Sequence, residues 1–280
     1  MDDLSFLEII YLLNIGLASY NFHSHISSEI PTHNQLIPGE NLKSQEILNK
    51  ISEWTKQQKM KLNERKTQNM IFNFSKKKQF TTKMKVNNTD LEVVDKCKIL
   101  GTVLTNNLSW NENTLELVKK GFKRMQLLYK AARFTNSRQD LKSIYLTYIR
   151  SAIEQSAVVW HSSLTRKNRK DLECVQKGAI KVILGSNYTT YKEGLKILKI
   201  QSLDDRRRTL CLKFATKSLK NEKVKNMFPI NEQKYRIETR KRNKFKIFKS
   251  NTNRYDKSAV PYMRRILNED WQNKMRNMQT

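Results

Sequence analysis

The sequence has few cysteines and no long apolar run, and both absences exclude classes of protein. Its three cysteines are far apart and odd in number, so they give neither a disulfide framework nor the paired spacing of a zinc site. No segment approaches the roughly 20 uninterrupted apolar residues of a membrane-spanning helix. The apolar stretch Leu4–Ala18 follows Asp2 and Asp3, the reverse of the basic start of a secretion signal. We therefore expect an intracellular protein, nuclear or cytoplasmic, that is not secreted.

Acidic residues are scarce beside basic ones. The chain has 54 Lys and Arg residues against 26 Asp and Glu residues, a formal net charge of +28. A polyanionic partner explains such an excess better than any need of the fold does. An anionic membrane surface is the rival to nucleic acid, but it usually requires a lipid anchor or a long apolar span beside a basic amphipathic helix. The sequence has neither, so we expect a nucleic-acid partner and no membrane.

The first part of the chain reads as one helix and a small β region. Ile47, Ile51, Trp54 and Gln58 share one face of a helix predicted from about residue 42 to residue 60. The β meander is predicted by apolar alternation over 70–74, an Asn-Asn turn at 87–88 and β-prone runs at 91–94 and 99–104. The apolar segment 1–17 fits a strand and a helix equally well, so periodicity does not decide its structure.

Beyond residue 113 the pattern is helical. Helices are predicted over 115–134, 139–158, 167–184 and 202–219. From Asn221 onward apolar density falls and 234–249 is rich in basic residues, which predicts a mobile basic arm. The fold class expected is α+β and predominantly α-helical. Three parts are expected: a β-containing part over 1–110, a helical domain over 111–220 and a basic, partly disordered segment over 221–280.

Several short motifs follow one another in an informative order. An Asp-Asp pair by itself says little, because such pairs are common in solvated turns. The motifs are Met1-Asp2-Asp3; Trp54 and then Met60–Thr67 before Met70-Ile71-Phe72; Lys98–Leu104 with Leu108–Asn111; Tyr145–Trp160; Leu172–Ala179; Ser202–Arg207; and Pro261–Asn268. In this order and rough spacing they resemble the C-terminal part of a reverse transcriptase from a LINE-type (non-LTR) retrotransposon. Gln155 departs from the family pattern, which usually has an aromatic residue there.

The resemblance implies a partial polymerase palm with motifs C, D and E over 1–110, then a helical thumb. Asp2 and Asp3 would be catalytic residues that hold Mg²⁺ for nucleotidyl transfer, a two-metal reaction. Lys66 would lie near the incoming nucleotide and donate a proton to pyrophosphate; read alone, it is a solvated lysine. Because the resemblance starts at the Asp-Asp motif, we expect a fragment of an RNA-directed DNA polymerase that is inactive alone and has no small-molecule substrate.

The partners implied are an RNA template and a DNA primer, contacted through their sugar-phosphate backbones. The expected contact residues are basic and lie in the thumb and the arm: Lys119, Lys120, Lys123, Arg124, Arg240, Lys241 and Arg242. Two other hypotheses remain open. One is a non-catalytic RNA- or DNA-binding protein, and the other is a helical scaffold, which would not explain the charge. Three histidines between residues 23 and 33 have no carboxylate or thiol at ligand spacing, so we expect no metal site there.

Overall fold

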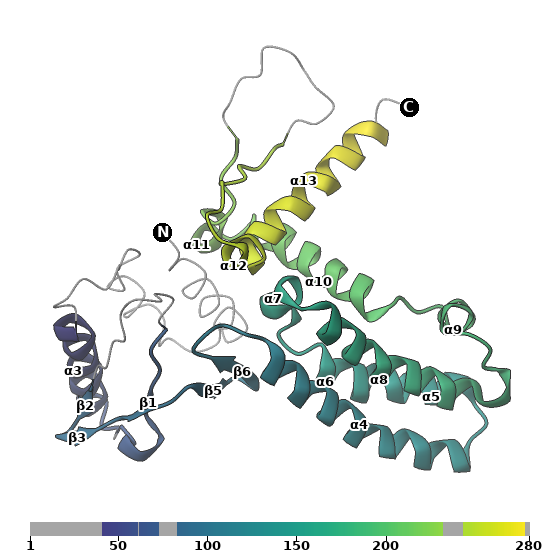
Figure 1. The fold of residues 1–280 in the computed structure, drawn as a ribbon, viewed down its shortest axis with the longest axis horizontal. Helices are drawn as coiled ribbons and strands as arrows, with labels where there is room; N and C mark the ends of the chain where they lie inside the picture. Colours follow the sequence, from purple (N-terminus) through teal and green to yellow (C-terminus); the bar gives the residue numbers. More distant parts are fainter. Residues whose placement is uncertain (1–40, 61, 73–82, 232–242, 278–280) are drawn as a thin grey trace. The chain divides into compact units, whose positions relative to one another are not determined.

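The computed structural model describes residues 41–60, 62–72, 83–231 and 243–277. The chain divides into two units, and in the described ranges the first ends at Asn113 and the second starts at Thr114. The structure is mostly helical with small sheets, which confirms the expected α+β, predominantly helical class (Figure 1). No helix in these ranges is long and apolar enough to cross a membrane. The expected three-part division stays a prediction.

Among the described residues of the first unit, the long helix is α3 (Asn41–Gln57), where the apolar spacing predicts one. The side chain of Gln45 forms two hydrogen bonds with the backbone of Lys85 in the neighbouring strand. Its Nε2 donates to the carbonyl of Lys85 at 2.8 Å, and its Oε1 accepts from the amide of Lys85 at 3.0 Å. Strand β2 (Lys85–Val86) is therefore fixed against the helix, with Val86 buried.

The strands form three separate pairs rather than one meander. Strand β2 pairs antiparallel with β3 (Thr89–Asp90), β1 (Gln68–Asn69) pairs in parallel with β4 (Glu92–Val93), and β5 (Lys96–Ile99) pairs antiparallel with β6 (Thr102–Thr105). The Asn-Asn turn is confirmed, since both asparagines have positive φ between β2 and β3. The strand expected over 70–74 is wrong at 70–72, because the pairing with β4 ends with β1 at Asn69 and residues 70–72 form no strand. Residues 73 and 74 lie outside the described residues.

The predicted strand over 99–104 is a hairpin. Leu100 and Gly101 have φ values of 52° and 80° and form the turn between β5 and β6. Two consecutive positive φ values are typical of a type I′ turn, whose backbone twist matches that of the flanking strands. The β-prone residues on each side of Leu100-Gly101 thus form strands, and Leu100 and Gly101 form the turn between them.

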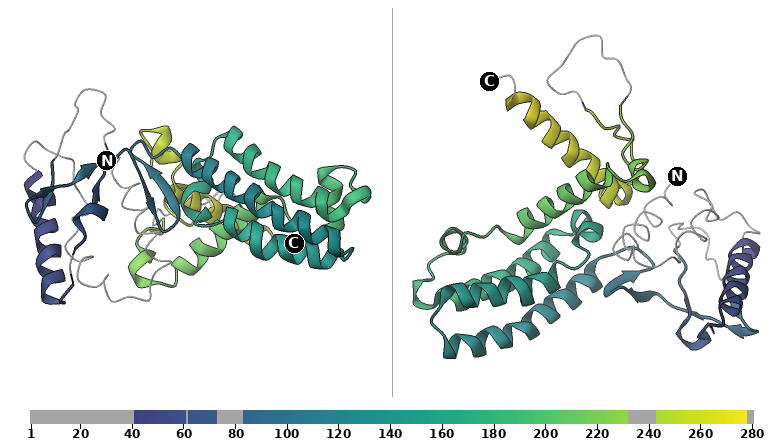
Figure 2. Two further views of the ribbon diagram at one scale, coloured as in Figure 1. Left: turned by 90° about the horizontal axis from the view of Figure 1, so that it is seen from below. Right: turned by 180° about the vertical axis from the view of Figure 1, so that it is seen from behind.

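The second unit is a helical array (Figures 1 and 2). Its elements are α4 (Asn111–Phe134), α5 (Arg138–Ile144), the π-helical turns η2 (Tyr145–Arg150), α6 (Ser151–Ile153), α7 (Ala157–Trp160), η3 (His161–Ser163), α8 (Arg166–Leu184), η4 (Gly185–Asn187), α9 (Tyr191–Leu198), α10 (Leu203–Ser218), α11 (Glu222–Lys225), α12 (Asn253–Asp256) and α13 (Ala259–Asn277). In both figures α4, the α5–α6 segment and α8 run side by side. The remaining element, η1 (Glu64–Lys66), belongs to the first unit.

A small residue lets α4 approach α8 closely. A Cβ atom on Gly121 would lie 2.8 Å from Cγ1 of Val175 and 3.0 Å from Cγ2 of Ile153. Met125 and Leu128 of α4 and Leu172 and Val175 of α8 are fully buried, as the apolar spacing predicts. These side chains are part of the core of the helical unit.

The single helix expected over 139–158 is broken, which corrects that prediction. It passes through the π-helical turns at 145–150 and stops at Glu154, and Ser156 has a φ of 54°. The reversal lets the indole Nε1 of buried Trp160 donate to the carbonyl of Gln155 at 2.9 Å. An αL residue outside glycine costs about 1 kcal/mol or more, and the burial of the Trp160 side chain offsets that cost.

The C-terminal segment is folded over much of its described length. Helix α13 packs on α10, and its Arg264 and Arg265 hold backbone carbonyls of the preceding segment, with Nε of Arg264 on Met227 at 2.8 Å and Nη2 of Arg265 on Asp256 at 2.6 Å. The basic stretch expected to be a mobile arm lies partly outside the described residues. Residues 243–249 of it are irregular, with an isolated bridge between Ile230 and Phe245 and hydrogen bonds between Phe245 and Asn268 of this helix.

Candidate nucleic-acid interface

Helix α4 presents a line of lysines on its exposed side. Its buried face is set by Leu117, Gly121, Met125 and Leu128, so residues half a turn away face solvent. Lys119, Lys123, Gln126 and Lys130 recur at intervals of four, three and four residues on this side, and all four are exposed. At 1.5 Å per residue the lysines span about 16 Å along the helix.

The ammonium groups of these lysines are not paired with carboxylates of the described residues. Among the described residues, Lys119, Lys123 and Lys130 form no ion pair, whereas Lys196, Lys225 and Lys274 elsewhere in the unit are paired with carboxylates. A duplex strand carries one phosphate per about 3.4 Å of axis, so the 16 Å line can meet several phosphates. The face can therefore bind a polyanion without first breaking an internal ion pair.

Exposed apolar side chains lie beside the lysines. Leu115, Phe122 and Tyr129 recur every seven residues and are 49%, 45% and 45% exposed. Heptad spacing places them along one strip of the helix, next to the lysine line. Apolar rings between cations suit sugar and base surfaces between phosphates. The face thus combines both kinds of contact that a nucleic acid offers.

The other two predicted thumb residues have packing roles. Nζ of Lys120 lies 3.3 Å from Oε1 of Gln155. Arg124 donates to the carbonyl of Tyr148, and its guanidinium lies 4.4 Å from the centre of that ring. Both side chains hold α4 to the segment that contains the π-helical turns, which leaves Lys119 and Lys123 as the exposed members of the predicted set. Sequence reasoning missed Lys130, although its spacing from Lys119 and Lys123 on the helix could have identified it.

The remaining predicted site residues lie in the first unit or outside the described residues. Lys66 is exposed at the end of η1, where its amide is capped by Asn63. Asp2, Asp3 and the arm residues Arg240, Lys241 and Arg242 lie outside the described residues. Within the described ranges no group of three or more His, Cys, Asp or Glu side chains could hold a metal ion.

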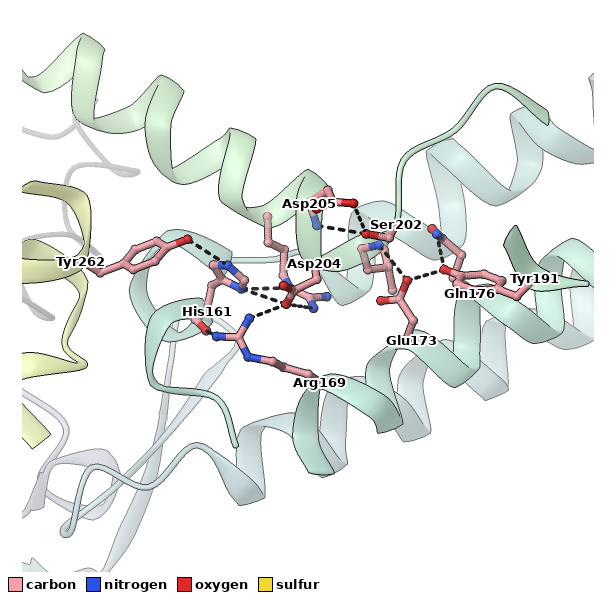
Figure 3. A network of polar contacts seen from close by, with 11 residues as sticks. His161, Arg169, Glu173, Gln176, Tyr191, Ser202, Asp204, Asp205 and Tyr262 are labelled. Carbon is pink, nitrogen blue, oxygen red and sulfur yellow. Dashed lines mark hydrogen bonds and ion pairs between the residues drawn. The ribbon is translucent and has the colours of Figure 1, made fainter. Parts of the chain in front are cut away.

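A partly buried polar network joins other helices of the same unit (Figure 3). Asp204, at the start of α10, accepts from Arg169 of α8 and lies 3.6 Å from Nη2 of Arg207. Nε of Arg207 donates to Nδ1 of His161 at 3.3 Å, and the other ring nitrogen of His161 lies 3.5 Å from the hydroxyl of Tyr262. Four helical elements, η3, α8, α10 and α13, are thus joined through one histidine.

The charges of this network are set by burial and by one another. Burial, followed by the neighbouring arginines Arg207 and Arg169, lowers the pKa of His161 to about 3. Burial opposes ionisation of Asp204, but Arg169 in particular outweighs it and the pKa of that carboxyl is lowered. Burial also lowers the pKa of Arg207, whose side chain is fully buried. The stable arrangement is therefore a neutral histidine between an ionised aspartate and two arginines.

A second branch of the network fixes the loop before α10. Glu173 of α8 accepts from the hydroxyl of Tyr191 and from the amide of Leu203, the latter at 3.1 Å. Burial and the bond to Glu173 raise the pKa of Tyr191. Gln176 donates to Tyr191 at 2.8 Å and accepts from the hydroxyl of Tyr145. Burial raises the pKa of Tyr145 well above its ordinary value, so both phenols act as neutral hydrogen-bond donors.

Many residues of the motifs identified in the sequence meet in this network. The thumb-like segment supplies Tyr145 and Trp160, the next segment supplies Glu173 and Gln176, and the segment Ser202–Arg207 supplies the cap of α10. Sequence spacing identified these segments but gave no sign that His161 joins them. Comparisons with models of known protein families, with curated proteins and with solved structures found no match.

Proposed function

We propose that the helical unit binds the sugar-phosphate backbone of a template-primer duplex through α4, in the manner of a reverse transcriptase thumb. The observation that carries the proposal is the line of exposed, unpaired lysines Lys119, Lys123 and Lys130 over about 16 Å of helix. The excess of 54 basic over 26 acidic residues supports it, because long-range attraction raises the rate and affinity of binding to a polyanion.

The helix offers backbone contacts rather than base readout. Lysine ammonium groups bind phosphates as point charges, without the two-pronged geometry that reads a base edge. Recognition of this kind depends on the shape and charge of the duplex and tolerates any sequence, as a polymerase requires of the duplex it has made. Lys120 and Arg124 tie α4 to the neighbouring segment through Gln155 and Tyr148, so the face is preorganised for binding.

The test compares two triple variants of the full chain. The first changes Lys119, Lys123 and Lys130 to Gln, and the matched control changes Lys196, Lys225 and Lys274 to Gln. Both lower the net charge equally, but the control lysines already pair with carboxylates. By fluorescence anisotropy with a labelled RNA–DNA duplex, the first variant should bind at least about fivefold more weakly and the control should bind like the unchanged chain. Equal losses would reject the α4 interface.

The order of the motifs supports a second part of the proposal, that the chain is part of an RNA-directed DNA polymerase of a mobile element. Asp2 and Asp3 would then hold Mg²⁺ and Lys66 would act near the leaving group. A primer-extension assay with Mg²⁺ tests this part. Template-dependent incorporation that is abolished in Asp2→Asn and Asp3→Asn would show polymerase activity in the chain itself and would contradict our expectation that it is inactive alone.

A further inference from the structure

A short irregular segment, residues 243–249, is held against α13 at Phe245. The amide of Phe245 donates to Oδ1 of Asn268 at 2.8 Å, and its carbonyl accepts from Nδ2 of the same side chain at 3.0 Å. On its other edge, the amide of Lys246 donates to the carbonyl of Pro229 at 2.9 Å. The Phe245 side chain is buried. The course of residues 243–249 is therefore fixed by α13 and not left to a flexible loop.

Three residues further on, this segment exposes an aromatic ring over a buried cation. Phe248 is 43% exposed, and the guanidinium carbon of Arg264 lies 4.6 Å from the centre of its ring. Arg264 itself is only 6% exposed, and its Nε donates to the carbonyl of Met227 at 2.8 Å. A guanidinium stacked on a ring fixes the ring orientation. Phe248 is thus a partly exposed ring on a rigid support.

Exposed lysines flank Phe248 along the chain, and one of them contacts its ring. Lys244, Lys246 and Lys249 are all exposed, and Nζ of Lys246 lies 5.2 Å from the ring centre of Phe248. Carboxylates of the neighbouring helices are already paired: Asp256 with Arg265, Glu269 with Arg208 and Asp270 with Lys274. The segment therefore presents positive charge and one supported ring together.

We propose that Phe248 is a stacking platform for a base of single-stranded nucleic acid, with phosphates of that strand held by Lys244, Lys246 and Lys249. Every base has a π face, so an aromatic ring among lysines binds a single strand with little regard to sequence. A duplex keeps its base faces stacked on one another and cannot use the ring. This site is separate from the α4 interface, since α10 lies between α4 and α13 in Figure 1, and it does not depend on the proposed duplex binding.

The test uses the full chain with single-stranded RNA and single-stranded DNA of one sequence, about 12 nucleotides long and carrying 2-aminopurine. Phe248→Ala should weaken binding of at least one strand by at least about fivefold, the lower end of what one stacked base contributes. It should also abolish quenching of the 2-aminopurine fluorescence. The RNA and DNA arms show which strand uses the platform. Ile230→Ala, a matched loss of an exposed apolar side chain nearby (62% exposed), should have no effect.

Two further variants separate stacking from folding. Phe248→Trp keeps a ring and should retain binding, whereas Phe248→Leu keeps an apolar side chain without a ring and should lose it. Unchanged affinity of Phe248→Ala for both strands would overturn the proposal. So would an equal loss of affinity for heparin, a polyanion without bases. Duplex binding should be unaffected by any of these variants, so failure here and failure of the α4 interface are distinguishable.

Discussion

Arg207 donates a hydrogen bond from its Nε to Nδ1 of His161 over 3.3 Å, and both side chains are buried. A ring nitrogen that accepts a hydrogen bond carries no proton, so His161 is neutral and is protonated on Nε2. Burial and the two arginines near it lower the pKa of His161 to about 3. Protonation of this one side chain would add a third positive charge beside Arg207 and Arg169, against the single carboxylate of Asp204, whose Oδ1 lies 4.0 Å from Nδ1 of His161.

The chain should therefore lose stability in mild acid. The folded-state pKa of His161 is below its unfolded value of about 6.5, so the unfolded state binds more protons below that pH and stability falls as the pH falls towards 3. From about pH 7.5 to 5.5 the free energy of unfolding should drop by about 1 to 1.5 kcal/mol. Urea titrations followed by helical circular dichroism measure this drop. In His161→Gln this part of the pH dependence should vanish, and an unchanged slope would contradict the neutral histidine.

Removing Asp204 and removing Arg207 should lower the free energy of unfolding by different amounts. Asp204→Ala takes away the carboxylate facing Arg169 and Arg207 and leaves a fully buried guanidinium without it. Because Asp204 is half exposed, the cost should be about 2–3 kcal/mol, below the usual range for breaking a buried pair. Arg207→Met removes the buried charge itself and keeps the Arg169–Asp204 pair, so it should cost less. The reverse order in denaturant titrations would show that Arg207 stabilises the fold directly.

Two glycines in the helical unit should give opposite results when changed to alanine. At Gly121 the added Cβ would lie 2.8 Å from Val175, so Gly121→Ala should destabilise by about 1–3 kcal/mol through overpacking. At Gly178 the nearest atom is the flexible end of Met125 at 3.4 Å, so Gly178→Ala should be neutral or stabilise by up to about 1 kcal/mol through helix propensity. Thermal melts of the two variants compare them directly, and equal effects would contradict the close approach of α4 and α8.

Replacing Leu100 with asparagine should stabilise the hairpin turn between β5 and β6. Leu100 has a φ of 52° and is 41% exposed, so it carries left-handed strain with little burial in return. Leu100→Asn should slow hydrogen exchange at the backbone amides of β5 and β6, because Asn-Gly is the favoured type I′ pair. Leu100→Ala is the control, since alanine has no such preference. Equal exchange rates in the two variants would contradict the turn assignment.

The helices could largely be predicted from the sequence, because their buried faces follow a regular spacing. The helix predicted over 167–184 is α8 (Arg166–Leu184), and the one predicted over 202–219 is α10, capped by Ser202. Apolar periodicity shows which face of a helix is buried, but it carries no information on where the helix is interrupted. The reversal at Ser156 depends on the burial of Trp160 against a distant helix, and the turn at Leu100 depends on strand pairing, so both were missed.

The candidate site was only half predictable for the same reason. A run of basic residues on one helix identifies positive charge, but whether each side chain faces solvent depends on its neighbours in three dimensions. Arg124 lies over Tyr148 and Lys120 reaches Gln155, whereas Lys130 is exposed. Similarly, the supported ring of Phe248 depends on Arg264, sixteen positions further along the chain, and no local pattern shows that contact.

The most direct test of the central claim is the salt dependence of duplex binding. Each lysine–phosphate contact contributes about 0.9 to the slope of the logarithm of affinity against the logarithm of salt concentration. Changing Lys119, Lys123 and Lys130 to Gln should therefore reduce the magnitude of that slope for an RNA–DNA duplex by about two to three. The matched variant at Lys196, Lys225 and Lys274 should keep the slope of the unchanged chain. An α4 variant whose slope equals that of the unchanged chain would contradict a nucleic-acid interface on this helix.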